Sequence, residues 1–148
     1  MTHRERAESL FLSGYNCAQA VLCAYSDVTG LDFETAKRLS ASFGGGMGKL
    51  REACGAVTGG FAVIGLLYGD YDVNDNKAKS EHYARVREVA ERFKQEFSTI
   101  NCESLLKGIA NAKGVDPAER TPEYYKTRPC IRFVGKMCDI LDDYIESK

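Results

Sequence analysis

The sequence predicts an all-α protein, and three observations support this fold class. Only three prolines occur among 148 residues, and the chain is rich in alanine, glutamate, lysine and arginine, which favour helix. Apolar residues recur three and four positions apart in several segments, as on one face of a helix. No segment alternates in the pattern of a strand ladder. We expect a single domain over residues 1–148, a bundle of about six helices around a central apolar helix that contains glycines.

Two helices are expected near the N-terminus. Apolar residues at helical spacing predict the first helix over residues 3–13, and Gly14 is suited to end it. Asn16 is a good capping residue for the second helix, which should run from Cys17 to about Ser26. The two helices are therefore expected to be separated by a short turn.

A third helix should begin near Asp32 and end before the segment Phe-Gly-Gly-Gly-Met-Gly at residues 43–48. Four glycines in five residues hold a helix poorly, because glycine loses the most backbone entropy when it is ordered. We therefore expect a flexible loop that lets the backbone approach another group closely. Cys54 then opens the next helix.

This next helix is predicted to be the central one. Residues 53–69 form a stretch of 17 without a charge, which is shorter than the roughly 20 apolar residues of a membrane span. The stretch also contains Thr58 and five glycines, so we expect a buried helix and no membrane span. Gly55 and Gly59 are four residues apart and share a helix face. We expect close contact there with another backbone or a bound group.

The second half of the chain contains a long amphipathic helix, a short helix and a last long helix. These are predicted at residues 77–97, 102–107 and 130–145 from the spacing of their apolar residues. Residues 108–129 carry glycine, Asp-Pro, Thr-Pro and Arg-Pro signals and are expected to be mostly loop.

The overall charge is balanced, with 20 lysines and arginines against 21 aspartates and glutamates. This balance argues against a nucleic-acid partner and against strong attraction to an anionic membrane. The N-terminus carries charges of both signs and no apolar core, so it does not read as a secretory signal, and we expect a cytoplasmic location. In a reducing cytoplasm, six cysteines are more naturally free thiols, metal ligands or redox groups than structural disulfides.

Four of the cysteines fall at or near the predicted first turn of separate helices: Cys17, Cys54, Cys102 and Cys130. The N-terminus of a helix carries about half a positive charge and unpaired N–H groups, which stabilise a thiolate. Thiolates attack disulfides and bind metals. The four residues are therefore the candidate catalytic residues and the candidate metal ligands.

Cys23 and Cys138 lie inside apolar helical segments, and we expect them to be small buried hydrophobic residues. Any further role of these two cysteines stays open. We expect Cys17 or Cys54 to be alkylated faster than these two cysteines near neutral pH. His3 and His82, the only histidines, do not neighbour a plausible nucleophile and are expected at the surface.

The segment Cys-Gly-Ala-Val-Thr-Gly at residues 54–59 resembles the motif of the C_GCAxxG_C_C family of redox-active proteins. That family has one cysteine upstream of the motif and two downstream, and the four candidate cysteines follow this order. Gly-Tyr-Asn-Cys at residues 14–17 and the glycine-rich segment at residues 43–48 strengthen the resemblance, which covers about residues 11–134. The resemblance implies redox or metal chemistry, but it supplies no substrate.

Our first hypothesis is a redox-active protein, an oxidoreductase or an electron carrier, in which the four cysteines converge on one site. They would cycle between dithiol and disulfide, or they would hold a metal, most plausibly a [2Fe–2S] cluster on four thiolates. Zinc stays open, although the short CxxC pairs typical of zinc sites are absent. The gaps of 36, 47 and 27 residues suit groups that tertiary packing brings together and exclude a thioredoxin-like CxxC. The redox partner is not indicated.

The glycines are candidates for the cofactor-binding part of this site. Backbone N–H groups in the segment that precedes Cys54 would donate hydrogen bonds to thiolate or cluster sulfur. The candidates are Gly44, Gly45, Gly46, Gly55 and Gly59. The alternative is that the segment only connects two helices and that the last two glycines only allow helices to pack.

Our second hypothesis is a non-catalytic helical accessory or partner-binding module in which the cysteines are structural. The long amphipathic helix and the glycine-rich packing face support it, and a homo-oligomer stays open under both hypotheses. A brown solution with visible absorbance would favour the cluster.

Overall fold

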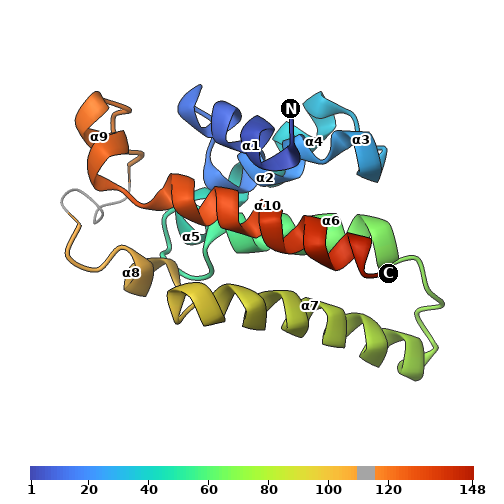
Figure 1. Cartoon of the computed structure of the whole chain (residues 1–148). Helices are drawn as coiled ribbons and strands as arrows, with labels where there is room; N and C mark the ends of the chain where they lie inside the picture. The colour runs from blue at the N-terminus through green and yellow to red at the C-terminus, as the bar shows by residue number, and fades with distance from the viewer. Residues whose placement is uncertain (110–115) are drawn as a thin grey trace.

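The computed structural model describes residues 1–109 and 116–148, and their secondary structure is helical (Figure 1). No strand occurs in these ranges, apart from one isolated antiparallel bridge between Ala53 and Asn101. The prediction of an all-α fold is confirmed. The described helices of eight or more residues are α1 (His3–Leu12), α2 (Cys17–Ala24), α4 (Phe33–Ser40), α6 (Gly55–Tyr68), α7 (Asn76–Phe97) and α10 (Cys130–Glu146).

Shorter helices complete the described chain. They are α3 (Ser26–Thr29), the 3-10 turn η1 (Ala41–Phe43), α5 (Gly44–Met47), α8 (Cys102–Leu105) and α9 (Pro122–Thr127). The expectation of mostly loop over residues 108–129 is therefore wrong for 122–127, where Thr121 caps α9 and Pro122 occupies its first turn. Residues 110–115, which belong to the same expectation, lie outside the described residues.

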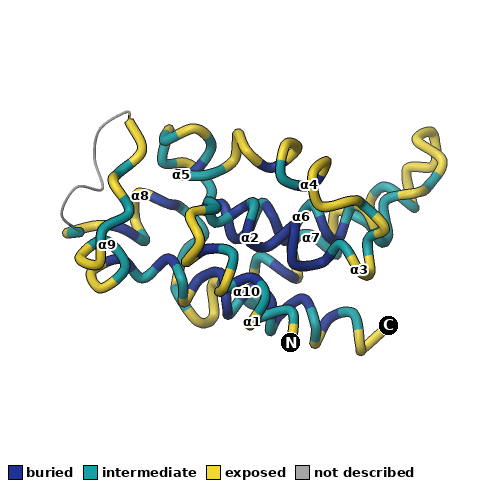
Figure 2. Tube along the Cα trace, turned by 90° about the horizontal axis from the view of Figure 1, so that it is seen from above, coloured by how far each residue is buried: buried dark blue, intermediate teal, exposed yellow. Residues whose placement is uncertain are grey.

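The central position of α6 is confirmed, because it packs against α2, α7 and α10. Its glycines set two of these contacts. A Cβ at Gly59 would lie 2.9 Å from the Ala18 carbonyl oxygen of α2, and one at Gly60 would lie 2.8 Å from the Met137 sulfur of α10. Figure 2 shows that buried residues concentrate along α2, α6 and α10. Among the described helices, none is long and apolar enough to cross a bilayer.

Side-chain caps fix where the helices around the cysteines begin. The Asn16 side chain accepts a hydrogen bond from the Gln19 N–H at 2.9 Å, and Gln19 returns one to the Asn16 N–H. The Asn101 side chain accepts from the Ser104 N–H at 2.9 Å. Because each cap satisfies N–H groups that the helix leaves unpaired, it fixes the first turn, and a cysteine follows both caps directly.

The glycine-rich segment differs from the expected flexible loop. Five consecutive residues from Gly45 to Lys49 have positive φ, and the Gly48 N–H donates to the Gly44 carbonyl oxygen, so the segment winds into a compact left-handed turn. Glycine adopts this conformation readily, but Met47 and Lys49 do so at a cost of about 1–2 kcal/mol each. The Glu52 N–H closes the turn onto the Gly46 carbonyl oxygen at 2.9 Å.

Candidate functional site

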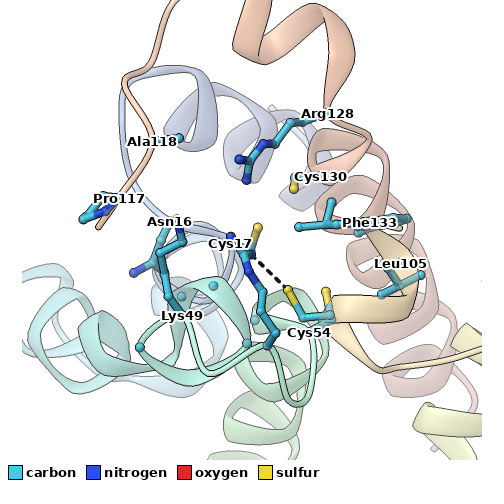
Figure 3. Close-up of a pocket in the computed structure, with 18 of the residues that line it drawn as sticks. Asn16, Cys17, Lys49, Cys54, Leu105, Pro117, Ala118, Arg128, Cys130 and Phe133 are labelled. Carbon is cyan, nitrogen blue, oxygen red and sulfur yellow. Dashed lines mark hydrogen bonds between the residues drawn. The ribbon is translucent and has the colours of Figure 1, made fainter. Parts of the chain in front are cut away.

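Four cysteines line one cavity of about 280 Å³, at the place where α2, α6, α8 and α10 begin (Figure 3). Cys17, Cys102 and Cys130 are the first residues of α2, α8 and α10, and Cys54 is the residue that precedes α6. The predicted helix starts are thus confirmed. The structure also brings these residues together from segments that are far apart in the sequence.

Cys17 and Cys130 line the cavity together and affect the pKa of one another. The Cys17 thiol donates a hydrogen bond to the Cys130 sulfur, which lowers the pKa of Cys130, and the positive charges of Arg128, Arg120 and Arg51 lower it further against the effect of burial. The same hydrogen bond and burial raise the pKa of Cys17. These opposite shifts favour ionisation at Cys130 over ionisation at Cys17.

Cys54 and Cys102 lie beside the bridge between Ala53 and Asn101. The Cys54 N–H donates to the Ile100 carbonyl oxygen at 2.7 Å, and the Cys102 N–H donates to the Glu52 carbonyl oxygen at 2.6 Å. In an antiparallel pairing these two cysteines occupy diagonal positions on the same face. Cys54 and Cys102 therefore lie on the same side of the bridge and line the same cavity.

The helix starts do not lower the pKa at every cysteine. Burial raises the pKa of Cys54 to about 12, although the Ala56 and Val57 N–H groups act in the opposite direction. Burial also raises the pKa of Cys102, against a hydrogen bond from Arg51 Nη1 to its sulfur at 3.3 Å. Desolvation of Cys54 thus outweighs the effect of the helix terminus on its pKa, and faster alkylation of Cys17 or Cys54 than of Cys23 and Cys138 stays a prediction.

The left-handed turn forms one wall of the cavity. Gly44, Gly45 and Gly46 line it, together with Gly55. A Cβ at Gly46 would lie 2.6 Å from the Cys102 Cβ, so this glycine lets the turn approach the cysteine. Gly55 likewise allows α6 to approach Cys17, whose Cβ would be 3.3 Å from an added Cβ.

Gly59 differs from the other candidate glycines. It does not line the cavity and instead packs against Ala18 of α2.

Four cationic side chains line the same cavity, and no aspartate or glutamate does so in the part of the chain that the structure describes. They are Lys49, Arg51, Arg120 and Arg128. Arg120 donates to the Phe11 and Tyr15 carbonyl oxygens at 3.1 Å each, and its guanidinium group lies 4.6 Å from the Phe11 ring centre. Sequence reasoning assigned no role to these cations.

A sequence signal for two of these cations was available. Arg51 precedes Cys54 by three residues, and Arg128 precedes Cys130 by two. A cation so close to a cysteine at a helix start is placed to stabilise a thiolate.

Arg51 has an unusual environment. Its Nη1 donates to the Cys102 sulfur, but its Nε and Nη2 are buried and have no hydrogen-bond partner among the described residues. Buried polar groups are nearly always satisfied, and an unsatisfied one costs about 1–3 kcal/mol, more when it is charged.

The remaining candidates lie elsewhere. Cys23 and Cys138 are buried in the core and do not line the cavity, and burial raises the pKa of Cys23 to about 11. His3, which was expected at the surface, is half-buried. It stacks on Tyr25 with the ring centres 4.1 Å apart, and its two ring nitrogens lie 2.9 Å from Asp27 and Asp142.

Within residues 1–109 and 116–148, no group of three or more histidine, cysteine, aspartate or glutamate side chains is placed to hold a metal ion. The four cysteines surround the cavity without forming such a group. The four thiols, at the starts of four helices, therefore face one cavity.

Comparison with known proteins identifies one family. The family model described as "Putative redox-active protein (C_GCAxxG_C_C)" matches residues 15–144, which contain all four cysteines of the cavity. No curated protein matches the chain, and no solved structure does.

Proposed function

The chain belongs to the C_GCAxxG_C_C family, and from this premise we propose that it is a thiol–disulfide oxidoreductase whose reactive pair is Cys130 and Cys17. The single observation that carries this proposal is that Cys17 and Cys130, the first residues of α2 and α10, line one cavity and interact there, which favours the thiolate at Cys130. A thiolate is the attacking species in thiol–disulfide exchange, and the second thiol must be near enough to resolve the intermediate.

The proposed reaction consists of two exchange steps. The Cys130 thiolate attacks one sulfur of a substrate disulfide, which forms a mixed disulfide and releases the other half of the substrate as a thiolate. Cys17 then gives up its proton to the first released thiolate and attacks the Cys130 sulfur, which releases the second half as a thiolate that takes a proton from solvent. The substrate disulfide is thereby reduced to two thiols, and the protein is left with a Cys17–Cys130 disulfide. An external dithiol, as a reducing cytoplasm would provide, returns the protein to the reduced state.

The positive surroundings of Cys130 support this role. Arg128 is buried, and its guanidinium group lies 4.6 Å from the Tyr124 ring centre, which holds the charge near the cavity. A fixed cation beside a thiolate stabilises it more in a buried site than in water, because the effective dielectric constant is lower there. The same charges disfavour protonation of Cys130 between turnovers.

The second candidate function is electron transfer by a [2Fe–2S] cluster. It is favoured by the four cysteines around one cavity, which match the usual donor set of such a cluster. In that case Cys17, Cys54, Cys102 and Cys130 would be the ligands, and N–H groups of the left-handed turn and of Gly55 would tune the cluster sulfurs. We rank it second because the described residues form no group placed to hold a metal ion.

One experiment separates these functions. Protein purified without oxygen is analysed for iron and visible absorbance, reacted with hydroxyethyl disulfide, then unfolded, alkylated and digested for peptide mass analysis. We expect no bound iron, a Cys17–Cys130 disulfide, and full alkylation of Cys23 and Cys138. The Cys130→Ser variant should form no disulfide, whereas Cys23→Ala, a matched change outside the cavity, should behave as the native protein does.

Two results would overturn the dithiol proposal. Stoichiometric iron that is lost in each single variant of the four cysteines would establish the cluster instead. Absence of both iron and a Cys17–Cys130 disulfide would leave the non-catalytic module.

A further inference from the structure

The cavity beside the reactive pair has the charge of an anion-binding site. Lys49, Arg51, Arg120 and Arg128 line it, and within the described residues no carboxylate side chain does. The Lys49 ammonium donates to the Asp116 carbonyl oxygen, and Arg120 donates to carbonyl oxygens and lies near aromatic rings. Carbonyl oxygens and rings hold Arg120 in place without neutralising its charge, whereas the charge of Asp116 acts on Lys49. A cleft lined by one sign of charge raises the local concentration of the opposite charge.

Arg51 differs from the other three cations, because two of its side-chain nitrogens have no hydrogen-bond partner among the described residues. Its Nη1 is bound to the Cys102 sulfur, whereas Nε and Nη2 are buried and unpartnered. Nε and Nη2 form one edge of the planar guanidinium group, and an edge of this kind binds a carboxylate through two parallel hydrogen bonds. Because both nitrogens are shielded from bulk solvent, binding requires the Arg51 side chain to turn within the cavity that it lines.

The rest of the lining limits the size and character of the ligand. Apolar side chains including Leu105, Leu106 and Phe133 complete the wall, and the volume of about 280 Å³ is at the lower end for small-molecule sites. A large or uniformly polar ligand does not suit such a cavity. A short apolar chain that ends in a carboxylate does.

We propose that the substrate of this site is a small disulfide that carries a carboxylate, which binds the free edge of Arg51 while the Cys130 thiolate attacks a sulfur of the substrate. This inference rests on the proposed function, because it names the substrate class of the same pair. The exchange steps are those given above, with two carboxylate-bearing thiols as products. Lys49 and Arg128 contribute long-range attraction, and Arg51 supplies the paired hydrogen bonds.

Three disulfides of similar length test the charge preference: dithiodipropionate, which is anionic, hydroxyethyl disulfide, which is neutral, and cystamine, which is cationic. The rate constant for formation of the Cys17–Cys130 disulfide is measured for each with the full-length reduced protein. We expect the anion to react on the order of tenfold or more faster than the neutral disulfide, with cystamine slowest, and the preference to shrink as salt is added. Equal rates, or cystamine as the fastest reagent, would overturn the inference.

Suberate, the all-carbon analogue of dithiodipropionate, gives a readout that needs no redox chemistry. Calorimetry should detect binding of suberate to the reduced native protein and not to Arg51→Met. Arg51→Lys keeps the charge but loses the paired edge, so it should bind weakly and keep only part of the anion preference. Circular dichroism of both variants establishes that they are folded, and Lys49→Met provides a second charge removal if Arg51→Met unfolds.

The two proposals fail in different ways. If hydroxyethyl disulfide forms the Cys17–Cys130 disulfide and suberate does not bind, the anion site is wrong and the redox pair stands. If suberate binds and no reagent forms that disulfide, the redox pair is wrong, and the claim that the anion is its substrate is wrong with it.

Discussion

Cys54 and Cys130 are buried to nearly the same degree, at 4% and 6% exposure. Their surroundings nevertheless shift the two pKa values in opposite directions. Burial dominates at Cys54 and raises its pKa to about 12, whereas the Cys17 hydrogen bond and three arginines lower the pKa of Cys130. Equal exposure makes the two residues a matched pair. A difference in their reactivity reports the fraction of thiolate and not access.

We therefore predict that iodoacetamide modifies Cys130 at least tenfold faster than Cys54 in the reduced protein near pH 7, a factor that about one pKa unit would produce. Peptide mass analysis after short labelling times provides the rates. Arg128→Met should slow labelling of Cys130 and leave that of Cys23 unchanged, because Cys23 lies outside the cavity. Equal labelling of Cys54 and Cys130 in the native protein would contradict the assignment.

The sequence predicted the positions of the site cysteines more clearly than it predicted which of them ionises. Asn16 and Asn101 are capping residues, so the helix starts at Cys17 and Cys102 could be predicted from local rules. Which thiol ionises depends first on the interaction of Cys130 with Cys17, which comes from a distant segment, and on desolvation. No local pattern in the sequence contains that information.

Among the elements, the left-handed turn of α5 is the one that depends most on glycine. Gly46 and Gly48 both have positive φ, at 68° and 60°. A Cβ at Gly46 would lie within 2.8 Å of the Arg51 Cα and the Glu52 nitrogen, whereas at Gly48 the nearest atom is 3.9 Å away. An alanine at either position would adopt a strained left-handed conformation, but only at Gly46 would its Cβ also collide with neighbouring atoms.

We predict that Gly48→Ala destabilises the reduced protein by about 1 kcal/mol, the usual cost of a left-handed alanine. Gly46→Ala should cost about 1–3 kcal/mol more, because backbone and the Cys102 side chain must move. Urea unfolding followed by circular dichroism measures both free energies. Should the two variants unfold at the same urea concentration, the close approach of the turn to Cys102 would be disproved.

The central helix α6 contains a second matched pair of glycines. A Cβ at Gly59 would lie 2.9 Å from the Ala18 carbonyl oxygen, whereas nothing lies within 4 Å of one at Gly65. We predict that Gly65→Ala stabilises the protein by up to about 1 kcal/mol through helix propensity alone. Gly59→Ala should destabilise it by about 1–3 kcal/mol, because α2 must shift. Thermal unfolding compares them, and a stabilising Gly59→Ala would refute tight packing of α2 on α6.

The elements that could be predicted from the sequence depend on local patterns, whereas the others depend on contacts between distant segments. The six longer helices follow apolar spacing and local caps, and all were predicted within a few residues. The left-handed turn depends on contacts with Glu52 and Cys102, and the bridge of Ala53 to Asn101 joins residues that are far apart in the chain. The helix α9 was missed because proline was taken as a loop signal, although it is also favoured in the first turn of a helix.

At the scale of the whole molecule, the proposed disulfide would join the start of α2 to the start of the last helix, α10. It would close a loop that contains most of the chain, and closing a loop of about 100 residues is expected to stabilise the folded state by about 4–5 kcal/mol. The cavity acts in the opposite direction on the reduced form, because it stabilises the Cys130 thiolate. The relative stability of the two forms is therefore set by a local site and by the global topology together.

This opposition predicts how the stability difference between oxidised and reduced protein depends on pH. The folded pKa of Cys130 is lowered below the ordinary value of 9.0, so its thiolate contributes stability to the reduced protein above pH 9.0, and this contribution is lost as pH falls through the folded pKa. The oxidised protein has no ionisable Cys130. Its advantage over the reduced protein should consequently shrink as pH rises through that window, by at most about 1.4 kcal/mol per pH unit.

Urea unfolding of both forms between about pH 6 and pH 9 measures this slope, and the window avoids the ionisation of Cys54, whose raised pKa acts above it. Cys23 is free in both forms and also ionises above the window, since its pKa is about 11, so it cancels in the difference. An advantage that stays constant over the window would mean that Cys130 is not the thiolate of the pair. If the advantage of the oxidised protein grew with pH, ionisation would destabilise the reduced protein. The arginines around Cys130 argue against this outcome, because they favour the charged form of Cys130.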